Sequence, residues 1–274
     1  MSVPRSDFVA QRAGDLMYYT VPRFAREAGV IAAFSSRRGG KSSGPYATLN
    51  LGLHVGDEPE AVLTNRTLLC GALGVDAVHL VSCAQVHGTR VAVVGTADRG
   101  RGAFDQSRAL PATDGLATGT PGVPLVTFYG DCVPLFLFDP VNRAIALAHA
   151  GWRGTLGRIG ARAVAVLGEK FGTTPAAVLA AVGPAIGPCC YTVGPDVAAL
   201  FVGEFSSGNR AVLNPEGGRL DLWSVNRQVL LEAGVRAENI AMARRCTACN
   251  PKEFFSHRTS GGKAGRMAAI MALE

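Results

Sequence analysis

The sequence lacks the features that mark membrane proteins, secreted proteins and disordered chains. No apolar run reaches the roughly 18 residues that a membrane-spanning helix needs. Residues 1–15 are polar and contain arginine, so no secretory signal pattern opens the chain. Only 18% of the residues are charged, which argues against disorder. These absences favour a globular protein with no membrane contact.

Long runs of positive charge are also missing. The formal net charge is +6, yet no stretch of five basic residues occurs and the arginines are scattered. A nucleic-acid-binding stripe is therefore not expected, and a small anionic substrate such as phosphate fits the charge better. An arginine-rich composition without functional meaning explains the same charge equally well.

Cysteine is present in an odd number, 7 residues, and the chain has 5 histidines. Without a secretory pattern, the thiols are expected to stay reduced in the cytoplasm. The pair Cys246-x-x-Cys249 could be a redox pair or part of a second zinc site. The sequence offers no second CxxC or His pair at a position that completes such a site, so this interpretation is disfavoured. The adjacent Cys189-Cys190 is interpreted as structural.

Strand-like and helix-like segments alternate irregularly along the 274 residues, with no internal repeat and no linker between halves. With 48% hydrophobic residues, the chain can bury a large core. This pattern predicts one mixed α/β (α+β) domain over residues 1–274, in which helices flank a mixed sheet. Residues 1–20 are expected to form a loose N-terminal arm that leads into a strand near Leu16–Thr20. The polar segment Gly95–Ala112 is expected to be a mobile excursion.

The central stretch of the chain combines apolar strands with possible metal ligands. Two strand-like runs, Pro124–Phe138 and Ala144–Ala148, are joined by a short turn. Adjacent strands could bring Cys132 and His149 together, and this pair of ligand types suits zinc. A third ligand must come from elsewhere, and His87, which also follows a strand-like run, is the best candidate.

Ordinary structural roles explain the same residues. A lone cysteine in an apolar strand is usually a small buried hydrophobe, and a lone histidine at a strand end is often simply hydrogen-bonded. The spacing of these residues matches no compact zinc signature. In a metal-free site, Cys132 beside a histidine could instead act as a hydrolase pair.

Two places along the chain could bind an anion. The loop at residues 35–46 is rich in glycine and serine and carries Arg37 and Lys41, so it offers backbone N–H groups and cations. It lacks the Walker spacing, and a flexible surface loop is an equal alternative. Arg153 precedes a predicted helix that begins near Thr155, and a helix N-terminus attracts anions.

A series of short motifs occurs along the chain in a specific order. The motifs are Ser36-Arg37-x-Gly39-Gly40, Gln85-Val86-His87-Gly88, Asp114-Gly115-Leu116, Asp131-Cys132-x-Pro134, His149-Ala150-Gly151-Trp152-Arg153-Gly154, Cys246-Thr247 and Phe254-Phe255-Ser256-x-Arg258. Together they resemble the laccase-domain (YfiH-like) proteins, viewed as multifunctional purine nucleoside phosphorylases. The resemblance extends from Phe34 to Met271. One departure is Tyr129-Gly130, where members usually have Thr-Ala, and it is expected to alter the pocket beside the metal.

The resemblance implies one zinc ion held by His87, Cys132 and His149, with copper binding possible in vitro. It implies phosphorolysis of adenosine, inosine and S-methyl-5'-thioadenosine, with adenosine deamination as a second activity. Nucleoside and phosphate are then the partners, and the chain is a monomer or a homodimer. A zinc ion with three protein ligands has an open fourth position, as catalytic zinc sites do.

Phosphorolysis needs cations that bind phosphate and a group that transfers a proton, and the sequence does not assign these roles uniquely. Asp131 is the candidate for proton transfer, or alternatively orients His87 or His149. Asp131, Arg37 and Cys132 form the predicted catalytic set. The predicted phosphate-binding cations are Arg37, Lys41 and Arg153.

Three other functions stay open at this point. The family resemblance also implies a hydrolase that edits peptidoglycan precursors, and the motifs do not distinguish it. The older family description, a copper polyphenol oxidase, fits poorly because the chain has only 5 histidines and no His-x-His pair. A protein that binds a ligand without turnover is the remaining alternative.

Overall fold

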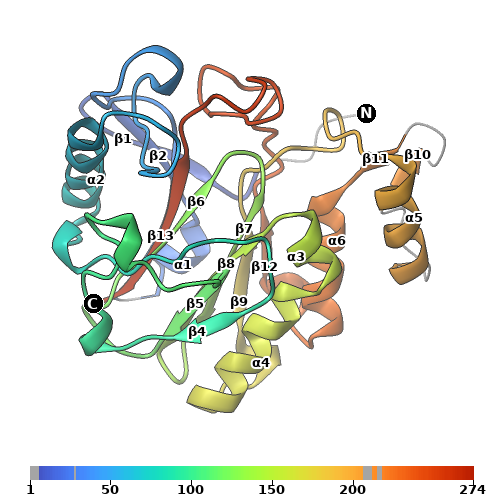
Figure 1. The fold of residues 1–274 in the computed structure, drawn as a ribbon. Coiled ribbons are helices and arrows are strands. Elements are labelled where there is room, and N and C mark those ends of the chain that lie inside the picture. The colour runs from blue at the N-terminus through green and yellow to red at the C-terminus, as the bar shows by residue number, and fades with distance from the viewer. Residues whose placement is uncertain (1–5, 28, 206–211, 215–217) are drawn as a thin grey trace.

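Most strands of the chain belong to two sheets that stack face to face (Figure 1). The structure is a computed structural model and describes residues 6–27, 29–205, 212–214 and 218–274. The five-stranded sheet has the order β1-β2-β3-β13-β6 and is antiparallel throughout. Its strands are β1 (Val9–Ala13), β2 (Leu16–Thr20), β3 (Val30–Ser35), β6 (Leu125–Tyr129) and β13 (Met267–Leu273).

The six-stranded sheet is mixed and has the order β12-β9-β7-β8-β5-β4. The outer pairs β12–β9 and β4–β5 are parallel, and the inner pairs are antiparallel. Its strands are β4 (Val91–Val93), β5 (Gly115–Thr118), β7 (Val133–Asp139), β8 (Ala144–Ala150), β9 (Leu179–Val182) and β12 (Ile240–Met242). The short pair β10 (Val212–Asn214) and β11 (Arg219–Leu220) stands apart.

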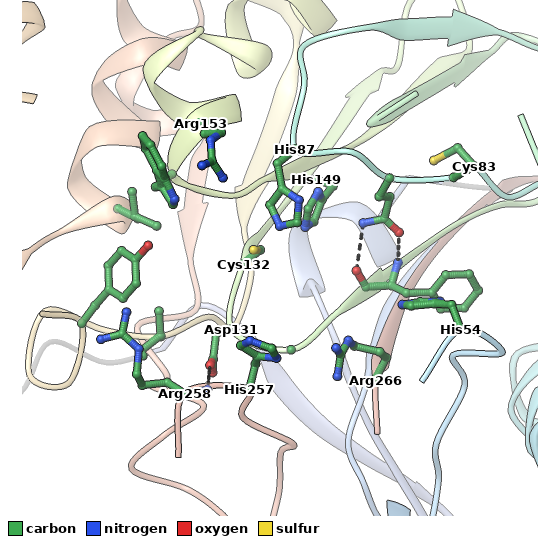
Figure 2. Close-up of a pocket in the computed structure, with 18 of the residues that line it drawn as sticks. His54, Cys83, His87, Asp131, Cys132, His149, Arg153, His257, Arg258 and Arg266 are labelled. Atoms are coloured by element: carbon green, nitrogen blue, oxygen red, sulfur yellow. Dashed lines mark hydrogen bonds between the residues drawn. The ribbon is translucent and has the colours of Figure 1, made fainter. Parts of the chain in front are cut away.

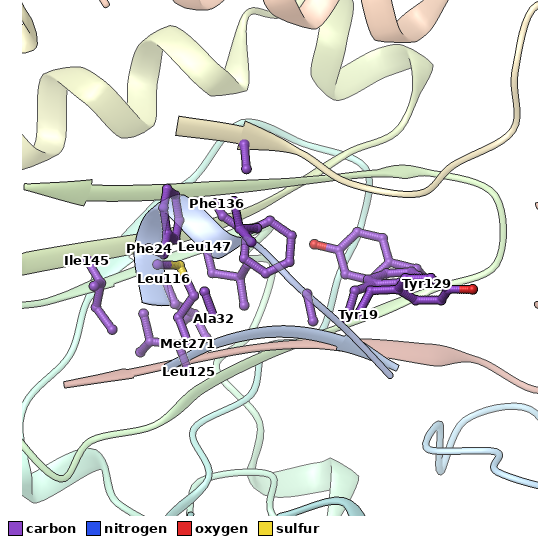
Figure 3. Close-up of a cluster of buried hydrophobic side chains, with 14 of the residues drawn as sticks. Tyr19, Phe24, Ala32, Leu116, Leu125, Tyr129, Phe136, Ile145, Leu147 and Met271 are labelled. Carbon is purple, nitrogen blue, oxygen red and sulfur yellow. The ribbon is translucent and has the colours of Figure 1, made fainter. Parts of the chain in front are cut away.

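The main hydrophobic core lies between the two sheets (Figure 3). It contains Tyr19 and Met271 from the five-stranded sheet and Phe136 and Leu147 from the six-stranded sheet. Successive side chains of a strand point to opposite faces, so alternate residues of β13 enter this core while Ile270 packs on the other side of the sheet. Both faces of β7, β8 and β13 are buried, which explains their nearly continuous apolar sequences.

Helices cover the outer faces of both sheets (Figure 1). Helix α2 (Pro59–Leu73) packs on the five-stranded sheet, and α4 (Ile159–Phe171) and α6 (Leu222–Glu232) pack on the six-stranded sheet. The remaining α-helices are α1 (Pro22–Ala25), α3 (Trp152–Leu156) and α5 (Pro195–Glu204). Within the described part of the chain, no helix is long and apolar enough to cross a membrane.

The mixed α/β fold predicted from the sequence is confirmed, and two details are corrected. The strand expected at Leu16–Thr20 is present as β2, but Val9–Ala13 pairs with it as β1 instead of continuing a loose arm. Residues 1–5 of that predicted arm lie outside the described residues. The segment Gly95–Ala112, expected to be a mobile excursion, is anchored because Ala103 and Leu110 are buried.

Candidate functional site

Three strands of the six-stranded sheet bring His87, Cys132 and His149 to one end of the molecule. Cys132 directly precedes β7, and His149 lies near the end of β8, where it is paired with Pro134 of β7. The open end of this hairpin therefore holds both residues. His87 lies in the loop before β4, which joins the sheet beside β5, and β5 in turn pairs with β8.

The three side chains form a compact cluster (Figure 2). One ligand atom from each of His87, Cys132 and His149 lies within 4.8 Å of the others. The two imidazole rings are 4.9 Å apart between centroids and meet at 72°. His149 is buried and His87 is exposed, so the cluster opens to solvent on one side. One sulfur and two ring nitrogens at this separation can hold a metal ion.

Backbone and side-chain hydrogen bonds fix the cluster through Asp114, a fully buried residue immediately before β5. Its Oδ1 lies 2.9 Å from Nδ1 of His149. Its two oxygens also accept the backbone N–H groups of Val86, His87 and Gly88 at 3.1, 2.9 and 2.8 Å. When Nδ1–H of His149 donates to this carboxylate, Nε2 is left free to bind a metal.

Sequence reasoning gave no role to Asp114, which it treated only as part of a motif. The sequence could not show that a carboxylate before β5 lies next to the end of β8. That proximity follows from the antiparallel pairing of Gly115 with Ala148. The histidine-orienting role suggested for Asp131 is therefore performed by Asp114 for His149.

The charges of the cluster stabilise one another in the metal-free protein. Burial alone raises the pKa of the Cys132 thiol, but the neighbouring His149 and His87 outweigh burial and lower that pKa to about 6. Burial alone lowers the pKa of His149, whereas Cys132 and Asp114 raise it to about 9. Each group therefore favours the charged form of the other, thiolate for Cys132 and imidazolium for His149. Burial opposes ionisation of Asp114, but its hydrogen bonds to His149 and to backbone N–H groups lower its pKa overall.

We expect this lowered pKa to appear in the reactivity of Cys132. In chelator-treated protein, iodoacetamide should alkylate Cys132 with a rate that rises with pH and is half-maximal near pH 6. An unperturbed cysteine has its midpoint near pH ~8.5. Peptide mass spectrometry after timed quenching would follow Cys132 separately from the other thiols. A midpoint for Cys132 at the unperturbed value would contradict the thiolate–imidazolium arrangement.

Asp131 lies beside the cluster but uses its carboxylate to join chain segments. Its oxygens accept hydrogen bonds from Thr247 Oγ1 at 2.6 Å, Ser256 Oγ at 3.0 Å and the backbone N–H of Arg258 at 2.7 Å. The backbone of Asp131 has φ 98°, a conformation that is rare for residues other than glycine. These contacts are those of a residue that positions Cys132 and the cavity wall.

A cavity of about 520 Å³ opens in front of the cluster (Figure 2). Its walls carry three arginines, Arg153, Arg258 and Arg266, together with the aromatic rings of Trp152 and Tyr191. The Arg153 guanidinium lies 4.3 Å from the Trp152 ring centroid, and the Arg258 guanidinium lies 5.0 Å from that of Tyr191. Such a cavity, partly apolar and lined by convergent cations, fits a small ligand with a ring and an anionic group.

The structure does not bring Arg37 or Lys41 to this cavity. The Arg37 guanidinium donates to the carbonyl of Ala47 through Nε and Nη2, at 2.9 and 2.8 Å, and to Pro251 through Nη1 at 3.0 Å. It also stacks on Phe255 at 4.4 Å. Its donors therefore hold loops together, away from the His87–Cys132–His149 cavity. Of the three predicted phosphate-binding cations, Arg153 alone lines the cavity.

At Tyr129-Gly130 the chain departs from the Thr-Ala that is usual in the family, and Gly130 is the residue of this pair that lines the cavity. The Tyr129 side chain is buried, with its hydroxyl 3.1 Å from the carbonyl oxygen of Ala148. Gly130 lines the cavity, and a Cβ at this position would lie 3.3 Å from Cδ and Nη1 of Arg266. The glycine therefore leaves room for the arginine side chain.

Comparison with known proteins agrees with this geometry. Residues 31–274 match the family model described as multi-copper polyphenol oxidoreductase laccase. The chain belongs to this family. Purine nucleoside phosphorylase YlmD of Geobacillus stearothermophilus, a relative, is 40% identical over 276 residues, with 97% of each chain covered.

Other relatives carry related names. A protein named adenosine deaminase RL5, from an unknown prokaryotic organism, is 39% identical over 249 residues, with 89% of this chain and 94% of that protein covered. The crystal structure of YlmD from Geobacillus stearothermophilus superimposes with a TM-score of 0.91 at 38% identity, covering 98% of this chain and 99% of that chain. The names of these family members support an enzyme that acts on purine nucleosides.

Proposed function

We propose that this protein is a zinc-dependent purine nucleoside phosphorylase that also deaminates adenosine. Adenosine, inosine and S-methyl-5'-thioadenosine are the proposed nucleosides, and phosphate is the second substrate. The observation that carries the proposal is the His87–Cys132–His149 cluster, oriented by Asp114, in a cavity lined by three arginines. The names of the relatives indicate the reaction. We propose the cytoplasm as the location of the protein.

The donor set fits zinc. One thiolate and two imidazoles are common zinc ligands, and Asp114 fixes the His149 ring as carboxylates do in many metal sites. Zinc in such a site supplies a Lewis acid and lowers the pKa of water. The same ligands bind copper, which accounts for the expectation that copper can enter in vitro.

The residues of the cavity would bind and orient the two substrates. Arg153, Arg258 and Arg266 are the cations available to phosphate, and they replace Arg37 and Lys41 in the proposal. Trp152 and Tyr191 offer aromatic faces to the purine. We assign Asp131 a positioning role, because its carboxylate accepts three hydrogen bonds that hold the loops beside Cys132.

A copper polyphenol oxidase is suggested by the description of the family. Among the described residues, however, only one potential metal-binding cluster includes histidine, and it contains two histidines. A multi-copper oxidase needs several copper ions with many histidine ligands close together. We therefore favour the reaction on nucleosides.

The proposal can be tested with purified, metal-analysed protein and adenosine, with and without phosphate. Chromatography would follow adenine, ribose 1-phosphate, inosine and hypoxanthine. We expect adenine and ribose 1-phosphate to form only with phosphate, and inosine to form without it. No turnover by zinc-loaded protein would refute the proposal, and hydrolysis of a peptidoglycan precursor would then replace it.

A further inference from the structure

Four cysteines from two distant parts of the chain meet beyond one edge of the six-stranded sheet. Cys189 and Cys190 follow β9, whereas Cys246 and Cys249 follow β12. These strands are parallel neighbours, so their carboxyl ends leave the sheet side by side (Figure 1). A further parallel bridge between Ala185 and Cys246 continues the pairing into the two loops.

The sulfur atoms are spaced as they would be around one ion. All four Sγ atoms lie within 4.8 Å of one another. Cys249 Sγ lies 3.5 Å from that of Cys189 and 3.4 Å from that of Cys190. Tetrahedral zinc with Zn–S bonds of about 2.3 Å separates its sulfurs by about 3.8 Å, which is within the observed range. Cys249 also lies about equally close to two thiols, as expected around a shared ion but not in a single disulfide.

Neighbouring groups complete the surroundings of this cluster. The backbone N–H of Gly187 donates to Cys246 Sγ at 3.2 Å, and such a donor stabilises a thiolate ligand. A Cβ at Gly187 would lie 2.7 Å from the Trp223 ring and 3.3 Å from Cys189 Sγ, so glycine permits the close approach of both side chains. Asn250 Nδ2 donates to the carbonyl of Cys246 at 2.7 Å and fixes the turn that carries Cys249.

We propose that Cys189, Cys190, Cys246 and Cys249 form a second metal site that binds one Zn²⁺. Four thiolate ligands leave no open coordination position, so this site is structural and not catalytic. An iron–sulfur cluster would distribute the cysteines over more than one iron, whereas these four sulfurs all lie within 4.8 Å of one another, close enough to share a single ion. Binding of the ion releases the protons of the thiols.

The proposed ion would join the two loops that form one wall of the cavity. One loop carries Ile186 and Tyr191, which line the cavity. The other carries Thr247, which donates to Asp131 beside the His87–Cys132–His149 cluster. The backbone N–H of Ile186 also donates to the carbonyl of Asp131 at 2.9 Å. The structural ion therefore stabilises the wall next to the proposed catalytic ion without contacting the substrate.

The test measures zinc in the full-length protein, purified under reducing conditions, by inductively coupled plasma mass spectrometry. Cys249→Ser and Cys132→Ala should each lose one zinc equivalent relative to the wild type, and the double variant should lose both. Cys70→Ala, which removes a buried thiol in α2, is the matched control and should keep the wild-type content. Should Cys249→Ser fail to fold, Cys189→Ser removes another exposed thiol of the cluster.

Cobalt(II) provides an independent readout. Added to metal-depleted Cys132→Ala protein, it should give the visible and thiolate charge-transfer absorption of a tetrahedral thiolate site, and the double variant should not. Wild-type zinc content in Cys249→Ser would overturn the proposal. Iron in place of zinc, or an intact mass showing the loss of two hydrogens to a disulfide, would also overturn it. Because these readouts do not use activity, failure of the proposed nucleoside reaction would leave this test unaffected.

Discussion

Replacing Cys132 with alanine is expected to abolish nucleoside turnover, with kcat/KM reduced at least about a thousandfold. The change removes one of three ligand atoms that lie within 4.8 Å of one another. It also leaves His149 without the thiolate that helps to hold its imidazolium in the metal-free protein. Steady-state kinetics with adenosine and phosphate, together with zinc analysis of the same preparation, would measure both effects.

Cys83→Ala is the control for this prediction. Cys83 is a buried thiol that also lines the cavity but lies outside both cysteine-containing clusters. Its removal should reduce kcat/KM far less than removal of Cys132. Cys132→Ser keeps the size of the side chain but replaces sulfur with a hydroxyl, a poor zinc ligand, so it should resemble the alanine variant. Full activity in Cys132→Ala would show that the reaction does not depend on this cluster.

Replacing Asp114 with asparagine is expected to weaken zinc binding at the His87–Cys132–His149 cluster by about 10–100-fold, with a similar loss of activity. The carboxylate of Asp114 accepts three backbone N–H groups and lies against His149 Nδ1. An asparagine has a single acceptor oxygen, and its NH₂ group would face some of these donors. The free energy of unfolding should therefore also fall, by roughly 2–4 kcal/mol.

Competition with a chelator of known affinity would measure zinc binding in Asp114→Asn, and chemical denaturation would measure its stability. Asp105→Asn is the matched control, because Asp105 is an exposed acid that accepts hydrogen bonds from the backbone and hydroxyl of Ser107. That change should alter neither quantity appreciably. Wild-type zinc affinity in Asp114→Asn would contradict the role of the carboxylate in orienting His149.

The sequence identified the residues whose chemistry is unusual for their surroundings. His87, Cys132 and His149 follow apolar strands, and the motif resemblance placed them in one site. The mixed α/β fold was predictable for a similar reason, since the long buried strands have strong apolar patterns. Strand β1 was missed because most of its residues are exposed, so it has no alternation of apolar and polar side chains.

Contacts that depend on strand order could not be read from the sequence. Cys189 and Cys249 belong to separate loops, and only the parallel pairing of β9 with β12 brings them together. The surroundings of Arg37 could not be predicted either, because its side chain contacts backbone carbonyls that the sequence does not place beside it. Its charge and its glycine-rich loop indicated an anion site, but its guanidinium is occupied by the carbonyls of Ala47 and Pro251.

The β7–β8 hairpin links formation of the His87–Cys132–His149 cluster to a single alignment of two strands. His149 is opposite Pro134, and Cys132 precedes the first residue of β7. A shift of the hairpin by one residue would turn His149 to the other face of the sheet. The three-ligand centre therefore exists only after these strands have paired correctly. A metal ion that bound this cluster would therefore favour the correctly aligned hairpin over misaligned ones, and would contribute to folding as well as to the proposed reaction.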